Sequence, residues 1–177
     1  MSMNTNSRKR TLFTCTAAAI AALYVALTYA SAALGLASYA IQVRFSEALC
    51  ILPFFTPAAI PGCILGCFLS NLLLGALWQD VIFGTLATAI GVFGAFLCRR
   101  LGFWAVPFPT VLANTLILPP VLLFAYGLEG GLAYFALTIG IGELLSVGGL
   151  GTLLYFGVQK HAHQLFGTPA RTPKKKG

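Results

Sequence analysis

The chain has 177 residues, of which 58% are hydrophobic and only 8% are charged, and its net charge at neutral pH is +7. Soluble domains carry about 25% charged residues, so this composition excludes a soluble globular protein. The basic residues gather at the two ends of the chain and at Arg99-Arg100. That distribution follows the positive-inside pattern of a multi-span membrane protein and argues against a nucleic-acid partner.

The chain opens with a basic segment, residues 1–10, which we expect to be cytoplasmic. The apolar run that follows, over residues 12–34, is longer than the core of a cleavable signal peptide and is long enough to cross a bilayer. We therefore expect a retained first transmembrane helix.

This first helix carries small side chains every four residues, at Thr14, Ala18, Ala22, Ala26 and Ala30. A stripe of small residues lets another helix approach closely. Two interpretations stay open. The stripe packs within the chain, or Ala18, Ala22 and Ala26 form a docking surface for a second membrane protein.

The next stretch, VRFSEALCILPFFTPAAIPG over residues 43–62, combines Arg44 and Glu47 with three prolines in an otherwise apolar region. Prolines break helices, so we expect a short, proline-broken second helix, a turn near Thr56, and a third helix over residues 58–75. Arg44 and Glu47 are three residues apart, which also allows a local ion pair that anchors the helix end.

The remaining apolar runs predict helices over residues 79–100, 105–127 and about 131–160, followed by a basic cytoplasmic tail over residues 161–177. The expected fold is an all-α membrane protein. Six transmembrane helices form a compact bundle over residues 11–160, and both termini are cytoplasmic, because an even number of crossings must separate the basic segments.

Glu143 is the sharpest candidate for chemistry, since no basic residue lies in its span. It falls about 12 residues, or roughly 18 Å, from the predicted outer end. A buried carboxylate needs a partner or must be protonated. Three possibilities stay open: a protonated acid, a pair with Arg44, or contact with a ligand that supplies N–H donors or positive charge.

Other candidates are weaker. Asn71 and Asn114 are amides in apolar helices, where interhelical hydrogen bonds are an equally good explanation. Asp80 and Glu129 fall at predicted outer turns, where solvated charge is ordinary. The aromatic candidates for stacking on a ligand are Tyr39, Phe45 and Trp78.

The sequence lacks the motifs of several classes of enzyme and metal-binding protein. The chain has no phosphate-binding glycine loop, no HExxH sequence and no histidine in its apolar runs. Its five cysteines lack the spacing of a metal site. We expect no enzyme activity, no cofactor and no bound metal.

The chain resembles the queuosine-precursor transporter (QueT) family, the substrate-binding S-components of energy-coupling factor (ECF) vitamin transporters. The resemblance covers roughly residues 12–160 and is most specific in the first block. It rests on Arg44, Ser46-Glu47-Ala48-Leu49, Leu52 to Gly62, Gly66-Cys67, Asn71-Leu72, Asp80 to Thr88, Pro107-Phe108-Pro109, Asn114 and Ile141-Gly142-Glu143.

The resemblance implies a bacterial cell-membrane protein that captures a 7-deazaguanine from outside and docks on a transmembrane subunit driven by two ATPases. It implies that the small-residue stripe of the first helix serves this docking and that the bundle topples during transport. Glu143 then accepts from the guanine-like edge of the ligand, and Glu47 meets a cationic substituent or supports the site. Arg44 orients Glu47 or donates to the ligand carbonyl, with Asn71 and Asn114 as further amide contacts.

Two other functions stay open: a self-sufficient secondary transporter, or an S-component for another vitamin-like molecule. A membrane scaffold without a small ligand is a third, but such a protein has no evident use for Glu143.

Overall fold

The computed structural model describes residues 5–36 and 43–166 of the chain, and this part is all helical. Tyr39 and the lysine-rich tail over residues 167–177 lie outside the described residues. Four helical segments are apolar and long enough to cross a membrane: Asn6–Ala33, Trp78–Cys98, Phe103–Ala125 and Leu132–Gln159. Two shorter apolar helices, Phe45–Phe54 and Ala59–Leu73, lie between the first and second of these. The all-α prediction is therefore confirmed.

Helix α1 (Thr5–Ala33) lies against α2 (Ala59–Leu73) because two glycines of α2 remove side chains from the contact. A Cβ added at Gly66 would stand 2.5 Å from the Cβ of Tyr24, and one at Gly62 would stand 2.9 Å from Ile20. Glycines four residues apart are the small-residue pattern that brings membrane helices together. This contact places Tyr24 beside the centre of the bundle.

The 3-10 helix η1 (Phe45–Phe54) lies in the interior, with every residue from Ser46 to Phe54 buried. Pro53 supplies no backbone N–H, and the chain turns at residues 55–58 before α2 begins. A 3-10 helix is geometrically strained and cannot face lipid with unsatisfied backbone groups. Its burial among α1, α2, α3 and α6 meets that requirement. The expected proline-broken short helix is present.

Helices α3 (Trp78–Cys98) and α4 (Pro107–Pro120) pack as a second close pair. The 3-10 turn η2 (Phe103–Ala105) joins them. Gly94 lies against Pro109, and Gly91 lies against Thr110. After Pro119 and Pro120 the helix widens into the π-helical segment η3 (Val121–Ala125).

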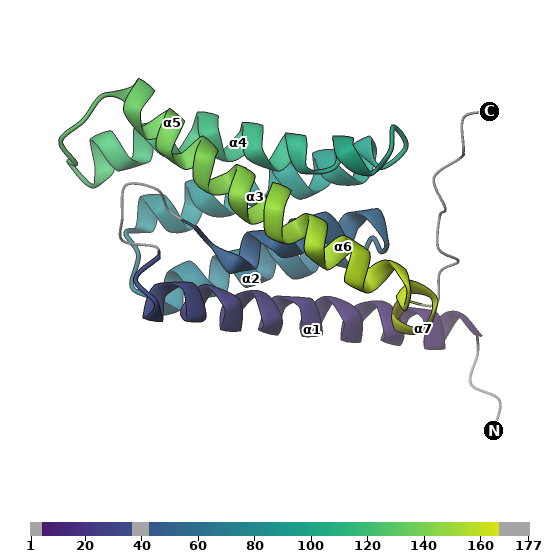
Figure 1. The fold of residues 1–177 in the computed structure, drawn as a ribbon. Helices are drawn as coiled ribbons and strands as arrows, with labels where there is room; N and C mark the ends of the chain where they lie inside the picture. The colour runs from purple at the N-terminus through teal and green to yellow at the C-terminus, as the bar shows by residue number, and fades with distance from the viewer. Residues whose placement is uncertain (1–4, 37–42, 167–177) are drawn as a thin grey trace, which may run out of the picture.

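The last long helix combines α5 (Leu132–Glu143), the π-helical segment η4 (Leu144–Leu150) and α6 (Gly151–Gln159). It crosses the front of the bundle in Figure 1 and ends beside the short helix α7 (Ala162–Phe166). The tail predicted from residue 161 thus begins with a helix. Phe166 stacks on Phe55 at 6.3 Å, which ties α7 to the turn after η1.

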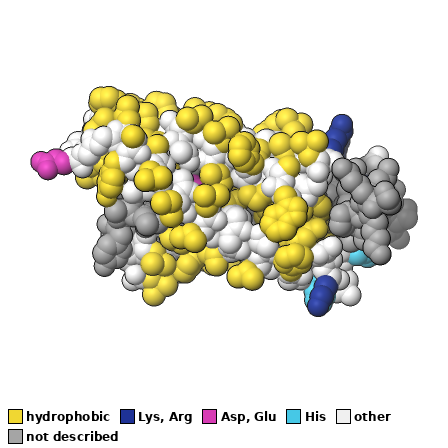
Figure 2. Space-filling model, turned by 45° about the horizontal axis from the view of Figure 1, so that its top comes forward, with side chains coloured by type: hydrophobic (Ala, Val, Ile, Leu, Met, Phe, Trp, Pro, Cys, Tyr) yellow, Lys and Arg dark blue, Asp and Glu magenta, His cyan; other side chains and the backbone are white. Residues whose placement is uncertain are grey.

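The two ends of the bundle differ in composition. The start of α1, the turn between α3 and α4, and α7 share one end (Figure 1). An aromatic cluster fills this end, with the Phe103 and Tyr155 rings stacked at 3.9 Å and the Phe54 ring 5.2 Å from Tyr155. Figure 2 shows apolar side chains along the flank, basic ones near this end and an acidic one at the other. That surface fits lipid along the sides and water at the ends.

The small-residue stripe of α1 faces outward. Ala18, Ala22, Ala26 and Ala30 are exposed, as is Thr14, whereas Ala17, Ile20, Tyr24 and Thr28 form the buried face. Of the two interpretations, packing within the chain is therefore wrong. The use of this face for docking stays a prediction.

Candidate functional site

Polar side chains gather in the interior around the start of η1. Hydrogen bonds to α1 fix the entry to this helix. The backbone N–H of Phe45 donates to Ser31 Oγ at 2.8 Å, and Thr28 Oγ1 donates to Ser46 Oγ at 2.8 Å. The backbone N–H of Arg44 donates to Ser146 Oγ in η4 at 3.1 Å. The first residues of η1 are thus held between the first and last long helices.

Glu47 is buried, and each of its carboxylate oxygens already accepts a hydrogen bond. The Tyr24 hydroxyl donates to Oε1, and Cys50 Sγ donates to Oε2 at 3.2 Å. The structure describes no ion pair between Glu47 and Arg44, so the local ion pair is not the arrangement within residues 43–166. Both oxygens of Glu47 are thus used within the protein, and its role is to hold Tyr24 and Cys50 in place.

Glu143 presents the opposite case. It is only 7% exposed, and its Oε2 has no hydrogen-bond partner among the described residues. Asn114, 2% exposed, lies beside it and its side chain interacts with the Glu143 carboxyl group, but no hydrogen bond of normal geometry joins them, and the Asn114 Nδ2 atom has no other partner among the described residues. A buried polar atom left unpaired costs about 1–3 kcal/mol, and more when the group is charged. The two side chains thus have only a loose contact with each other, and a ligand between them would find one acceptor and one donor.

The position of Glu143 in its helix supports a functional role. It is the last residue of α5, and the chain passes directly into π-helical η4. Single π-helical turns within α-helices often occur at functional sites, because the wider turn redirects the side chains around it. Here the wider turn also provides Ser146, which accepts from the Arg44 backbone.

Arg44 is the one basic residue of the described chain within this cluster, and three acids act on it. Asp80, Glu47 and Glu143 all lie near enough for their charges to act on its guanidinium. Its guanidinium makes no hydrogen bond with residues 5–36 or 43–166. Three of the four acids of the chain therefore lie within electrostatic range of one cation.

Asp80 is not the solvated turn residue expected from the sequence, and that expectation is wrong. It is 8% exposed and lies in the first turn of α3, where a negative charge is favoured by the helix dipole. The Tyr126 hydroxyl donates to its Oδ2 at 3.2 Å and accepts from the Leu77 N–H at 3.3 Å. Partial burial and the charge of Asp80 raise the pKa of Tyr126 above its usual value, which keeps this donor protonated.

Asn71 reaches the cluster from α2. Its Nδ2 donates to Cys67 Sγ at 3.6 Å, and the same sulfur accepts from Thr88 Oγ1 of α3 at 3.3 Å. Cys67 thus works as a small buried acceptor between two helices. Asn71 is 3% exposed and faces Asp80 across Gly84.

Four of the predicted site residues therefore belong to one polar cluster: Arg44, Glu47, Asn114 and Glu143. Asn71 lies beside Asp80 at Gly84. Phe45 is next to Arg44 in the sequence, at the start of η1. Trp78 does not join it, because its side chain is 66% exposed and lines an apolar groove between α3 and η3. Tyr39 lies outside the described residues.

Sequence reasoning missed Tyr24, Asp80, Tyr126 and Ser146. One signal was present for the first of them, because Tyr24, Thr28 and Ser31 repeat at helical spacing along one face of an apolar helix. Asp80 opens one of the blocks on which the family resemblance rests, but nothing in the pattern signalled its burial. Its burial depends on the end of a distant helix that covers it.

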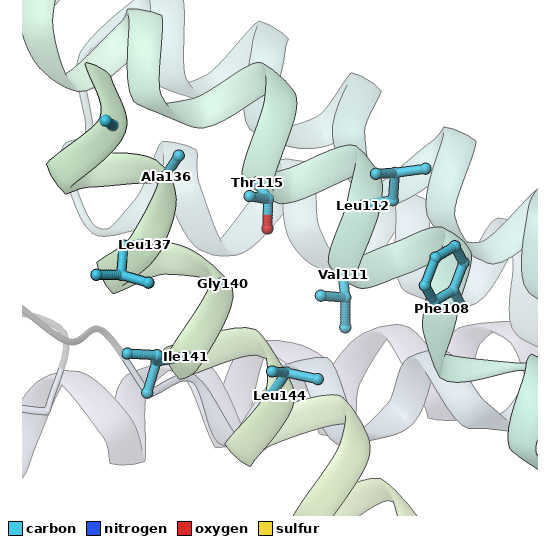
Figure 3. A pocket seen from close by; sticks show the side chains of 10 residues that line it. Phe108, Val111, Leu112, Thr115, Ala136, Leu137, Gly140, Ile141 and Leu144 are labelled. Atoms are coloured by element: carbon cyan, nitrogen blue, oxygen red, sulfur yellow. The ribbon is translucent and has the colours of Figure 1, made fainter.

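Two lateral grooves are apolar and do not share the chemistry of the polar cluster. One, of about 560 Å³, lies between α4 and α5. Figure 3 shows its aliphatic and aromatic lining, in which Thr115 is the single residue with a polar side chain. The other, of about 650 Å³, contains Trp78. Grooves of this kind suit hydrocarbon, whereas the polar cluster suits a hydrogen-bonding ligand.

Comparisons with known proteins agree with this arrangement. Residues 14–160 match the QueT transporter family. A protein of Lactococcus lactis subsp. cremoris (strain MG1363) named queuosine precursor transporter QueT is 40% identical over 75 residues. That alignment covers 42% of this chain and 44% of the relative, so the chain spans less than half of the relative's length. No solved structure matches the chain.

Proposed function

Because the chain belongs to the QueT transporter family, we propose that it is the substrate-binding S-component of an ECF-type importer for a queuosine precursor of the 7-deazaguanine type. The observation that carries the proposal is the buried pair of Glu143 and Asn114, whose Oε2 and Nδ2 atoms have no hydrogen-bond partner in the part of the chain that the structure describes. The relative named queuosine precursor transporter QueT supports the choice of ligand.

The chemistry of the pair suits such a ligand. A guanine-like edge presents neighbouring N–H and NH2 donors, and one carboxylate accepts from both. The same ring carries a carbonyl oxygen, which matches the free Nδ2 of Asn114. Glu143 and Asn114 therefore read the base edge in this proposal. Glu47 holds Tyr24 and the start of η1 and does not touch the base.

The proposed topology has six crossings, with both termini in the cytoplasm. Its support is the shared end of the bundle at which α1 begins, α3 turns into α4 and α7 lies. Helices η1 and α2 provide the second and third crossings. They contain 10 and 15 residues, and each is shorter than a full bilayer span. The aromatic cluster then closes the cytoplasmic end below the polar cluster.

Docking on a transmembrane partner is the second half of the proposal. Its support is the outward face of α1, where Ala18, Ala22 and Ala26 leave a smooth strip on the lipid side. Small residues allow close contact between membrane helices by van der Waals packing. The partners in this proposal are the transmembrane subunit and two ATPases of an ECF module.

Reconstitution tests the proposal against a self-sufficient transporter. The purified chain is placed in proteoliposomes with labelled 7-aminomethyl-7-deazaguanine, either alone or with an ECF module and internal ATP. We expect binding by the chain alone and uptake only with the module and ATP. Uptake by the chain alone, driven by a gradient, contradicts the S-component assignment and favours a secondary transporter.

A further inference from the structure

We propose that the lateral groove between α4 and α5 binds one acyl chain of an anionic phospholipid, whose phosphate lies at Arg100. The inference requires only that the chain spans a membrane. It does not depend on which ligand the polar cluster binds.

The groove has a hydrocarbon surface. Its volume is about 560 Å³, and Thr115 is the single residue with a polar side chain in its lining. The Oγ1 atom of that threonine is itself buried. Gly140 faces it across the floor of the groove, where an added Cβ would stand 3.4 Å from this oxygen (Figure 3). The lining therefore presents almost only carbon to an occupant.

The walls of the groove favour a thin occupant. Phe108 and Leu112 stand on the α4 side, and Leu137 and Leu144 on the other, each between 48% and 67% exposed. A transmembrane helix is about 10–12 Å wide and packs closely where side chains are small, as on the outer face of α1. A single hydrocarbon chain is much thinner and fits between bulky walls. The groove extends along its helix from Leu144 to Ala133, about 16 Å, which is close to the hydrocarbon depth of one leaflet.

Positive charge lies just beyond the Phe108 end of the groove. Gly94 of α3 is level with Pro109, because a Cβ added there would be 2.5 Å from the Pro109 Cβ. Arg100 comes six residues after Gly94, about 9 Å further toward the end of the bundle, and it is exposed. A phosphate at Arg100 and an acyl chain starting beside Phe108 follow the order of groups in a phospholipid.

The turn between α3 and α4 has the composition of a membrane–water boundary. Leu101 and Trp104 are 81% and 80% exposed next to Arg100 in the sequence. Tryptophan is enriched at that boundary, and the arginine guanidinium binds phosphate oxygens well. Basic sites between transmembrane helices on the cytoplasmic side bind anionic lipid headgroups. The charge of Arg100 thus selects an anionic phospholipid over a zwitterionic one.

A lipid in this groove also contacts the helices that carry the polar pair. Thr115 directly follows Asn114, and Leu144 directly follows Glu143. An acyl chain in the groove packs on the membrane side of both helices. Because it binds the folded chain, the lipid raises the melting temperature.

Native mass spectrometry of the purified full chain in detergent tests the headgroup. The probes are palmitoyl-oleoyl phosphatidylglycerol and the matching phosphatidylcholine. We expect the first phosphatidylglycerol to bind about fivefold or more tightly, the effect of one basic residue beside an anionic lipid. Arg100→Gln removes most of this preference. Arg8→Gln makes the same change at the exposed start of α1, across the bundle in Figure 1, and keeps the preference.

A second pair of variants tests the groove. Ala136→Leu fills it, and Ala125→Leu places the same side chain in the other lateral groove. We expect Ala136→Leu to weaken phosphatidylglycerol binding about tenfold, the effect of displacing about two CH2 groups of the acyl chain. Ala125→Leu leaves it unchanged. On the wild type, phosphatidylglycerol with a photoreactive group in its acyl chain cross-links to residues 107–120 and 132–144.

Three results overturn the inference: equal binding of the two lipids, equal losses within either pair of variants, or cross-links spread evenly over all helices. If Ala136→Leu binds lipid normally but loses module-dependent uptake, the groove belongs to a partner helix, and the inference is also overturned. If Ala136→Leu does not fold, cross-linking of the wild type decides. The proposed function stands or falls separately, because none of these measurements uses a deazaguanine.

Discussion

Replacing Glu143 with glutamine separates ligand recognition from folding. The side chain keeps its size, but the carboxylate, whose Oε2 has no partner among residues 5–36 and 43–166, becomes a neutral amide. Where the glutamine NH2 replaces Oε2, a donor faces the N–H donors of the base edge, and the hydrogen bond is lost. A hydrogen bond to a charged group is worth about 1.5–3 kcal/mol, so Glu143→Gln loses about 10- to 150-fold in affinity for the deazaguanine.

Stability responds differently to the same change. Glu143 is 7% exposed and its Oε2 has no hydrogen-bond partner among the described residues, so a neutral amide at this position breaks no hydrogen bond that holds the fold. We expect the melting temperature of Glu143→Gln to be equal to or above that of the wild type. Calorimetry and a thermal melt on the same detergent preparation measure both quantities, with Glu129→Gln as the control. Unchanged ligand affinity in a folded Glu143→Gln protein refutes the reasoning.

Three further predictions concern the residues that hold the site and its outer face. Glu47→Gln lowers the free energy of unfolding by about 1–3 kcal/mol in denaturant titrations, because Tyr24 or Cys50 loses its acceptor; unchanged stability contradicts this role. Gly66→Ala lowers the melting temperature, at a cost of about 1–3 kcal/mol, because its Cβ meets Tyr24. Gly157→Ala serves as the control, because a Cβ at Gly157 meets no atom within 4 Å. Equal melting temperatures for Gly66→Ala and Gly157→Ala would show that α1 and α2 adjust freely. Ala22→Trp keeps ligand binding but abolishes module-dependent uptake, and loss of binding as well would contradict a docking face.

The sequence predicted the helices well because each apolar run is bounded by charges, prolines or glycines. The expected helix over residues 79–100 is α3 (Trp78–Cys98), and the one over residues 58–75 is α2 (Ala59–Leu73). The proline pattern also located the turn after η1. Neither the 3-10 form of η1 nor the π-helical turns could be predicted, because they depend on tertiary packing around Pro53, Pro120 and Glu143.

The site was predicted in part, for a physical reason. A carboxylate in an apolar span is conspicuous, so Glu143 and Glu47 were found from their positions within apolar runs. Their different roles were not, because these depend on hydrogen bonds between distant helices, such as that from Tyr24 to Glu47. Asp80 looked like an ordinary residue at a helix start, and only its contact with Tyr126, 46 residues away, reveals its burial.

The central claim is that the polar cluster around Glu143 binds a deazaguanine. A calorimetric panel on the purified chain tests it most directly, with queuine, its aminomethyl and cyano precursors, guanine and several vitamins as ligands. We expect submicromolar binding of at least one deazaguanine, weaker binding of guanine and no binding of the vitamins. Submicromolar binding of a vitamin with no binding of any deazaguanine contradicts the claim.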